Sequence, residues 1–272
     1  MERRPRPKRS LSQNFLVDPN LRRKLVASLQ AASGDTVVEV GAGHGELSEE
    51  LVGRVARLVL VEKDDALAAE LRERWGDRPD VWVVLGDALE LDLSALADGP
   101  GPLRVISNIP YGITTPLIFR LLELRPTPRR LLVTVQKEVA ERIVAVPGTP
   151  AYGALTVGVQ TKANARVAFS LGRQAFRPVP AVDSAAVIIE PFEERLAPTD
   201  EEALRALTRT AFARRRKQLQ KILRSSPEFA LSPEEVDRLC REIGLDPTTR
   251  PERLAPERFL ALARRIRAVR TD

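Results

Sequence analysis

The chain has 272 residues, of which 43% are hydrophobic and 29% charged, a balance that is typical of a folded globular protein and excludes a disordered one. One cysteine, Cys240, and one histidine, His44, exclude a disulfide framework and a metal centre of histidine and cysteine ligands, and argue against a Ser-His-Asp triad. No apolar run approaches the roughly 18 residues of a membrane span and no apolar core follows the basic N-terminus, so we expect a cytoplasmic protein.

The formal net charge of +6 is concentrated at the two ends of the chain. Residues 1–24 contain eight basic and two acidic side chains, and residues 197–272 contain seventeen basic and twelve acidic ones, whereas the residues between them are net acidic. Basic arms and helices of this kind suit the phosphate backbone of a nucleic acid, because their binding releases condensed counterions. The clustering therefore favours RNA over a small metabolite as the partner.

The first predicted helix covers residues 18–29, because Asp18 suits a helix cap and Pro19 suits the first turn. Beyond it, short apolar runs alternate with helical stretches. The predicted strands are Val37–Val40, Leu58–Val61, Val81–Leu85, Val105–Ile106 and Leu131–Val135. The predicted helices are Leu47–Val52, Ala66–Trp75, Pro116–Leu124 and Glu138–Val144. Fully apolar strands separated by helices predict a doubly wound parallel sheet that is covered on both faces.

Two further runs, Ala165–Leu171 and Ala185–Glu190, predict an antiparallel addition at the edge of the sheet, while Tyr152–Val159 is open to helix or strand. After a linker, the pattern is wholly helical, with predicted helices at Glu201–Ala213, Arg216–Leu223, Pro233–Ile243 and Pro256–Val269. The expected organisation is a basic N-terminal arm over residues 1–12, an α/β domain over 13–195 and a small helical domain over 196–272.

A glycine-rich turn, Gly41-Ala42-Gly43-His44-Gly45, follows the first predicted strand. Glycines at the carboxyl edge of a parallel sheet let the backbone approach a bound ligand. Glu62 ends the second strand, where a carboxylate typically binds ribose hydroxyls. Asp87 ends the third strand, where its oxygens suit the exocyclic amine of an adenine. The three features together predict a cofactor that contains a nucleoside.

The turn differs from the dinucleotide fingerprint, because it reads Gly-x-Gly-x-Gly and is followed by Glu46 where a pyrophosphate would bind. A cofactor with a ribose but no phosphate fits better, so we expect S-adenosylmethionine. Glu39, inside the first strand, is placed for a hydrogen bond either to the glycine loop or to the neighbouring chain. His44 is expected at the solvent edge of the loop.

The fourth predicted strand ends in Asn108-Ile109-Pro110-Tyr111, which suits methyl transfer to the amine of adenine. This amine is a poor nucleophile because its lone pair is delocalised into the ring, so it needs acceptors for its N–H groups rather than a strong base. The Asn108 side-chain oxygen and the Ile109 carbonyl, fixed by Pro110, supply two acceptors. The Tyr111 ring offers a stacking surface. The alternative is that these residues have a purely structural role, as an ordinary Asn-x-Pro turn.

Phe176 is a second aromatic candidate, in a loop that Pro178 and Pro180 stiffen. Chemistry on a base requires that the base be unstacked from its neighbours first. We therefore expect Phe176 to clamp the other face of the base, with a core anchor as its alternative role.

Four segments that carry these residues occur in a familiar order, and they resemble the rRNA adenine N6-methyltransferases over about Lys8 to Phe259. The segments are Gln13-Asn14-Phe15-Leu16, Glu39-Val40-Gly41-Ala42-Gly43, Asn108-Ile109-Pro110-Tyr111, and Phe176-Arg177-Pro178 with Val182-Asp183-Ser184. The resemblance implies a Rossmann-like class I S-adenosylmethionine-dependent methyltransferase with a mostly parallel seven-stranded sheet and a small all-α C-terminal domain. It also implies cofactor contacts at Asn14, Leu16, Gly41, Glu62, Asp87 and Asn108. Reasoning from the residues alone interprets Asn14–Leu16 only as the lead-in to a helix.

Two segments, 135–153 and 212–219, resemble the KsgA/RsmA branch of that superfamily. The second resembles the basic helix of the branch's small domain, and we hypothesise that Arg214, Arg215, Arg216 and Lys217 bind RNA phosphate, with a solvated helix face as the alternative. The branch implies dimethylation of two adjacent adenosines in the 3′-terminal hairpin loop of small-subunit rRNA, within a ribosome-assembly intermediate. Gly112, which stands where the family often has asparagine, and His44 depart from the family pattern.

Three alternatives remain at this point. An Erm-type enzyme would methylate an adenosine of large-subunit (23S) rRNA and confer macrolide resistance, and an assembly factor would bind the small subunit without depending on catalysis. The third, a small-molecule methyltransferase, is disfavoured because a metabolite needs neither basic segment. No oligomer interface is evident, so a monomer is the default expectation, and no metal is expected.

Overall fold

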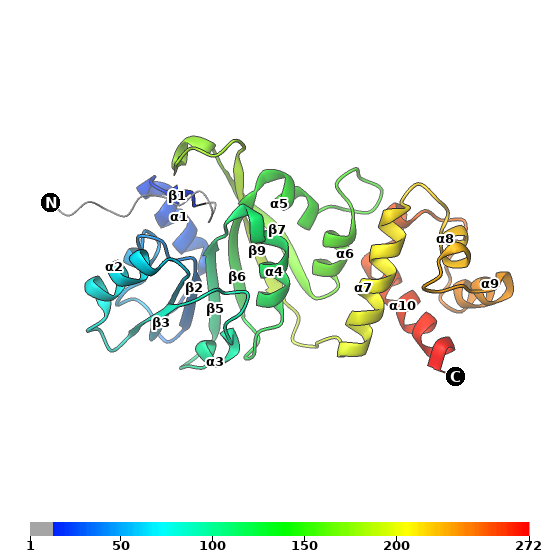
Figure 1. The fold of residues 1–272 in the computed structure, drawn as a ribbon, viewed down its shortest axis with the longest axis horizontal. Coiled ribbons are helices and arrows are strands. Elements are labelled where there is room, and N and C mark those ends of the chain that lie inside the picture. Colours follow the sequence, from blue (N-terminus) through cyan, green and yellow to red (C-terminus); the bar gives the residue numbers. More distant parts are fainter. Residues whose placement is uncertain (1–12, 272) are drawn as a thin grey trace. The chain divides into compact units, whose positions relative to one another are not determined.

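The computed structural model describes residues 13–271, so the basic arm expected at residues 1–12 lies outside the described residues. The chain divides into two compact units (Figure 1). The first contains the residues up to Ala140 together with Ala165–Pro191, and the second contains Glu141–Asn164 and the residues from Phe192 onwards.

The first unit is built on a seven-stranded sheet whose order is β4-β3-β2-β5-β6-β9-β7. Its strands are β2 (Thr36–Val40), β3 (Arg57–Glu62), β4 (Val81–Leu85), β5 (Leu103–Asn108), β6 (Arg130–Gln136), β7 (Ala163–Leu171) and β9 (Ser184–Pro191). The strands from β4 to β6 pair in parallel, and β9 is antiparallel to β6. The predicted Rossmann-like fold, with an antiparallel addition, is therefore confirmed.

Helices α2 (Asp65–Trp75), α3 (Leu93–Ala97) and α4 (Thr114–Leu122) connect the successive parallel strands from β3 to β6, as the right-handed crossovers of such sheets require. Helix α1 (Pro19–Leu29) precedes β2, and α5 (Lys137–Ile143) follows β6. The Asp18 carboxylate caps α1 as predicted, since it accepts hydrogen bonds from the backbone amides of residues 20 and 21. The predicted helix at 47–52 is wrong, because only one 3-10 turn, η2 (Ser48–Glu50), forms there.

A two-stranded ladder, which the sequence reasoning missed, joins two distant segments of the first unit. Strand β1 (Phe15–Leu16) runs antiparallel to β8 (Phe176–Arg177), with Leu16 opposite Phe176. Both of these side chains are almost fully buried, within a core that includes Val37 and Ile106 from the central strands. The expected helix lead-in at 14–16 is therefore an extended segment, because its pairing partner lies 160 residues away in the chain.

The second unit is helical, with α6 (Ala154–Gln160), α7 (Pro198–Ala213), α8 (Leu219–Ser225), α9 (Pro233–Glu242) and α10 (Pro256–Thr271). Tyr152 is 1% exposed in its core, beside Leu207 and Phe259, and its hydroxyl donates to the Leu254 carbonyl at 2.6 Å. This burial explains why residues 141–164 group with the C-terminal helices, which differs from a single boundary at residue 195. The segment Tyr152–Val159, which the sequence left open to helix or strand, is largely helical, because α6 begins at Ala154.

Candidate active site

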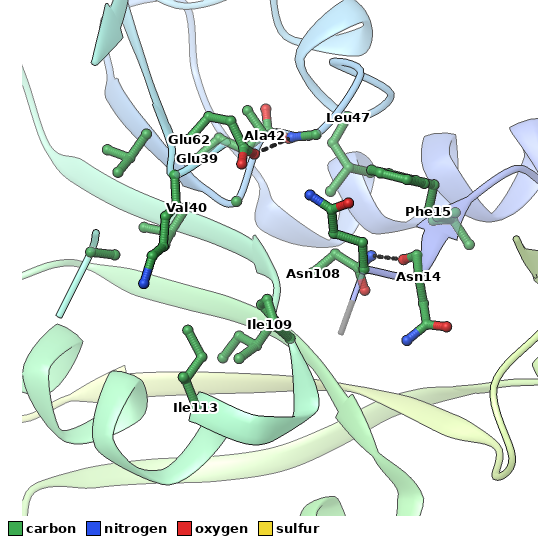
Figure 2. Close-up of a pocket in the computed structure, with 18 of the residues that line it drawn as sticks. Asn14, Phe15, Glu39, Val40, Ala42, Leu47, Glu62, Asn108, Ile109 and Ile113 are labelled. Carbon is green, nitrogen blue, oxygen red and sulfur yellow. Dashed lines mark hydrogen bonds between the residues drawn. The ribbon is translucent and has the colours of Figure 1, made fainter. Parts of the chain in front are cut away.

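A cavity of about 270 Å³ opens at the carboxyl ends of β2, β3, β4 and β5 (Figure 2). Ligands bind at this edge in open α/β sheets, because the loops there diverge and expose backbone groups. The predicted site residues that line it are Asn14, Leu16, Gly41, Glu62, Asp87, Asn108, Ile109, Pro110 and Tyr111. Residues from five separate segments of the sequence thus meet in one place, as the resemblance implied.

The glycine loop after β2 is held against the carboxylate that ends β3. The Gly43 amide donates to one Glu62 oxygen at 2.8 Å, and the Asp64 amide donates to the other at 2.8 Å. Gly43 has φ +61° and Gly45 has φ +79°, a backbone conformation that residues with a side chain rarely adopt. A methyl group on Gly45 would also come within 2.5 Å of the Trp75 ring. Both the curvature and the close packing of the loop therefore depend on glycine.

Glu62 is 6% exposed, and its burial raises the pKa of the carboxyl although the amides of Asp64 and Gly43 oppose that shift. Each carboxylate oxygen has two lone pairs, so an oxygen bonded to one amide retains capacity for a second donor. The carboxylate that was predicted to bind ribose hydroxyls is thus held in a fixed orientation on the cavity wall.

Glu39 is fully enclosed in β2, and its partner is Ser48, whose hydroxyl donates to a Glu39 oxygen at 2.6 Å. Burial raises the pKa of the Glu39 carboxyl to about 8, and the nearby Glu46 and Glu62 contribute to the rise. Of the two roles expected for Glu39, the observed hydrogen bond is to the neighbouring chain, at Ser48, and not to the glycine loop itself.

Asp87, which follows β4, has a different electrostatic environment from that of Glu39 and Glu62. Its carboxylate accepts hydrogen bonds from the Lys63 ammonium at 2.6 Å and from the Leu89 amide at 2.9 Å. The hydrogen bond from Lys63 is the main reason that the pKa of Asp87 falls below its usual value. Asp87 is therefore ionised at neutral pH and acts only as an acceptor.

The Asn108 amide is oriented by the N-terminal segment. Its Nδ2 donates to the Asn14 carbonyl oxygen at 2.8 Å, the contact drawn as a dashed line in Figure 2. A carbonyl only accepts, so this contact fixes which end of the amide is nitrogen and leaves Oδ1 as the acceptor. The neighbouring Ser107 hydroxyl donates to the Val40 carbonyl at 2.7 Å and ties the end of β5 to β2.

The residues after Asn108 leave the strand in a defined turn. The Ile109 amide donates to the Thr134 carbonyl at 3.2 Å, which anchors the turn to β6. Tyr111 is half-buried, and its hydroxyl lies 2.8 Å from the Ser184 hydroxyl at the start of β9. Burial raises the pKa of the Tyr111 phenol, so the ring is neutral at physiological pH. The turn thus places Ile109 and Tyr111 beside Asn108 on the wall of the cavity.

Phe176 does not occupy the position expected of a clamp. It is 1% exposed, lies in the core cluster with Leu16, and is outside the set of residues that line the cavity. The β1–β8 ladder explains this placement, because it pairs Phe176 directly with the buried Leu16. In this structure Phe176 is therefore a core anchor.

The expectation for His44 is also wrong, because its ring is buried instead of lying at the solvent edge. The residue is 8% exposed, and Nδ1 lies 2.8 Å from a Glu70 oxygen. Sequence reasoning had no signal for this contact, because α2 brings Glu70 back to the loop from 26 residues away.

The basic segment Arg214–Lys217 is a turn and not the predicted helix, since α7 ends at Ala213 and α8 begins at Leu219. Arg215 binds Glu252 at 3.2 Å and the carbonyls of Pro150 and Thr149, so it holds the second unit together. Arg214 donates to the Ser225 hydroxyl at 2.7 Å. Arg216 and Lys217 are exposed. The four cations thus separate into two with structural contacts and two that face solvent.

Two negative findings apply to residues 13–271. No helix there combines the length and apolarity needed to cross a membrane. No group of three or more histidine, cysteine, aspartate or glutamate side chains in that part of the chain is arranged to hold a metal ion.

Known proteins share both the sequence and the fold. The ribosomal RNA adenine dimethylase family model matches residues 5–267. The ribosomal RNA small subunit methyltransferase A of Chlorobium luteolum is 44% identical over 219 residues, which cover 80% of this chain and 78% of that protein. The structure of a dimethyladenosine transferase from Plasmodium falciparum aligns with a TM-score of 0.74 and 25% identity, over 91% of this chain and 95% of that one. The 23S rRNA methyltransferase ErmE aligns with a TM-score of 0.67 and 27% identity, over 93% and 99% respectively. The chain belongs to the ribosomal RNA adenine dimethylase family.

Proposed function

We propose that this protein dimethylates, from S-adenosylmethionine, the N6 amines of two adjacent adenosines in the 3′-terminal hairpin loop of small-subunit (16S) rRNA. The single observation that supports the chemistry most directly is the orientation of the Asn108 amide by the Asn14 carbonyl. The match to a relative named for the small subunit supports the choice of rRNA. The proposed setting is a monomer in the cytoplasm that acts during ribosome biogenesis.

The donor set of the cavity fits an adenosyl cofactor. Glu62 offers carboxylate oxygens for ribose hydroxyls, and Asp87 offers an ionised acceptor for the exocyclic amine of the cofactor's adenine. Gly41 lets the backbone approach the ligand, and Asn14 and Leu16 form the facing wall. S-adenosylmethionine, when bound, supplies an electrophilic methyl group on a sulfonium centre.

Catalysis by the chain's own groups consists of orientation and charge stabilisation. The Asn108 Oδ1 and the Ile109 carbonyl accept the two N–H groups of the target amine and stabilise the positive charge that develops on its nitrogen. Tyr111, held by Ser184, provides the face on which the target base stacks. The excess proton passes to water after transfer, so no histidine base is required.

RNA phosphate is proposed to bind the turn Arg214–Lys217, chiefly through the exposed Arg216 and Lys217. The double variant R216A/K217A should weaken RNA binding and reduce the slope of log K against log salt by roughly 1 to 2. R215A is the matched comparison, and it should instead lower the melting temperature, because it leaves Glu252 and two carbonyls without their donor. Filter binding at four salt concentrations measures the slope, and an unchanged slope in R216A/K217A would remove these residues from the RNA site.

The test of the function is transfer of labelled methyl groups to small ribosomal subunits that lack the modification, followed by mapping of the product nucleoside. N6,N6-dimethyladenosine at two adjacent positions, formed by the native chain and lost in N108A, is the expected result. Asn164→Ala, an exposed asparagine outside the cavity, is the control. Methylation of large-subunit rRNA instead would favour an Erm-type activity, in keeping with the ErmE likeness. Cofactor binding without transfer to either subunit would favour an assembly factor.

A further inference from the structure

The only histidine of the chain takes no part in the proposed chemistry, yet it sits where three elements of the first unit meet. His44 belongs to the glycine loop, its partner Glu70 belongs to α2, and Phe15 approaches it from β1. The ring centroids of Phe15 and His44 lie 4.6 Å apart, with the planes tilted by 52°. This is a direct contact between the glycine loop and the N-terminal segment, by which we mean residues 13–16.

The His44 ring is itself held from the side of α2. Its Nδ1 lies 2.8 Å from a Glu70 carboxylate oxygen, and Arg74 donates to the His44 backbone carbonyl at 3.3 Å. This contact fixes the ring against α2. Arg74 is paired in turn with Glu49 at 2.7 Å. The ring therefore has a fixed orientation when it meets Phe15.

Phe15 lies close over the loop as well as against His44. A methyl group placed on Gly43 would come within 3.1 Å of two carbons of the Phe15 ring. Phe15 stands between Asn14 and Leu16, and all three residues line the cavity; Figure 2 labels Asn14 and Phe15 there together with Asn108. The Asn14 carbonyl is the group that orients the Asn108 amide. The placement of Phe15 thus affects both the wall of the cavity and the orientation of the Asn108 amide.

We infer that His44 is a positioning residue, whose ring holds Phe15 and so keeps the N-terminal segment closed against the cofactor cavity. This inference rests on the proposed cofactor. The ring contact is the part that acts, while Glu70 only sets the angle of the ring. Because an aromatic pair contributes about 1 kcal/mol, its loss should weaken cofactor binding about fivefold.

Two substitutions separate the ring contact from the hydrogen bond. Gln at position 44 retains an N–H donor for Glu70 but no ring, whereas Phe retains a ring for Phe15 but no donor. Glu70 is 25% exposed, so water can solvate its carboxylate in the second variant. We expect H44Q to raise the dissociation constant for S-adenosylmethionine about fivefold and H44F to leave it within twofold, as measured by titration calorimetry. Unchanged binding in folded H44Q, or weakened binding in folded H44F, would overturn the inference.

A double-mutant cycle tests whether the effect passes through Phe15. F15L removes the aromatic partner, so adding H44Q to F15L should change the dissociation constant by no more than twofold. If H44Q retained its full effect in the F15L background, the ring contact would not be the cause. In methyl transfer, H44Q should raise the KM for the cofactor about fivefold while kcat at saturation stays within twofold, a split that general destabilisation does not produce.

R54A serves as the control, because Arg54 is exposed and, among residues 13–271, its ion pair is with Glu50, at 3.6 Å. The proposed function and this inference fail differently. If the native chain did not bind S-adenosylmethionine, the proposed cofactor would be wrong, whereas native binding with an unaffected H44Q would refute the role of His44 alone.

Discussion

The two walls of the cavity are built in different ways. One, the acidic wall, consists of Glu39, the glycine loop, Glu62 and Asp87, and its carboxylates are bonded to backbone amides, to Ser48 or to Lys63. The other, the N-terminal wall, consists of residues 13–16 and is held by the two-residue β1–β8 ladder and a few side-chain contacts.

This difference predicts which substitutions change the stability of the protein and which change only its affinity for the ligand. The acidic wall extends directly from strands of the central sheet, so a change there affects folding as well as binding. In the N-terminal wall Leu16 is buried in the core, whereas residues 13–15 are only partly buried, so changes at those three should alter ligand affinity at small cost in stability. Asn108 joins the two walls, because it ends β5 and donates to Asn14.

The largest effect is expected where the walls join. Asp at position 108 matches Asn in shape but carries no N–H donor when ionised, so N108D would place a carboxylate oxygen against the Asn14 carbonyl. We expect kcat for methyl transfer to fall roughly a hundredfold to a thousandfold, as when an oriented polar group is lost from an active site. Asn164→Asp is the matched control. Wild-type turnover in N108D would show that the Asn14 contact does not orient the catalytic group.

Glu39, in the acidic wall, should make the free energy of unfolding depend on pH. Burial raises the pKa of Glu39 from 4.5 to about 8, so between these values the native state keeps a proton that the unfolded chain loses. The free energy of unfolding should therefore fall as the pH rises from about 5 to 8, by an amount on the order of 1 to 3 kcal/mol. Glu39→Gln, which keeps an acceptor for Ser48, should flatten this dependence.

Urea unfolding at pH 5, 6.5 and 8 measures that dependence for Glu39→Gln. Glu73→Gln, a substitution of an exposed residue on the same unit, should retain the native slope. Equal slopes for the native chain and Glu39→Gln would place the pH sensitivity elsewhere in the molecule.

The smallest effect is expected in the N-terminal wall. Arg22 donates to the Leu16 carbonyl at 2.8 Å and to the Val17 carbonyl at 3.3 Å, so it holds the end of β1. R22A should lower the free energy of unfolding by only about 1 kcal/mol. It should also raise the dissociation constant for S-adenosylmethionine up to about fivefold, measured by calorimetry. R23A, which loses only an exposed contact with Asn20, is the comparison, and equal affinities in the two variants would contradict a distinct N-terminal wall.

Much of the acidic wall could be predicted from the sequence. Glycine turns and carboxylates at the ends of apolar runs are local signals, and parallel topology brings such strand ends to one edge. The Asn108–Tyr111 turn was predicted for the same reason. Phe176 was misplaced because an aromatic residue between prolines has the same local pattern whether its ring faces a ligand or the core.

The sequence by itself determined the fold class, the chemistry of the strand ends and, through its motifs, the family. Only the tertiary structure decided that residues 15–16 form a strand against β8, that His44 is buried against Phe15, and that Arg215 is a structural residue while Arg216 and Lys217 face solvent. The physical reason is the range of the contacts. A cap, a turn or an apolar strand is encoded within a few neighbouring residues, whereas these three outcomes depend on partners between 26 and about 160 residues away, which no local pattern specifies.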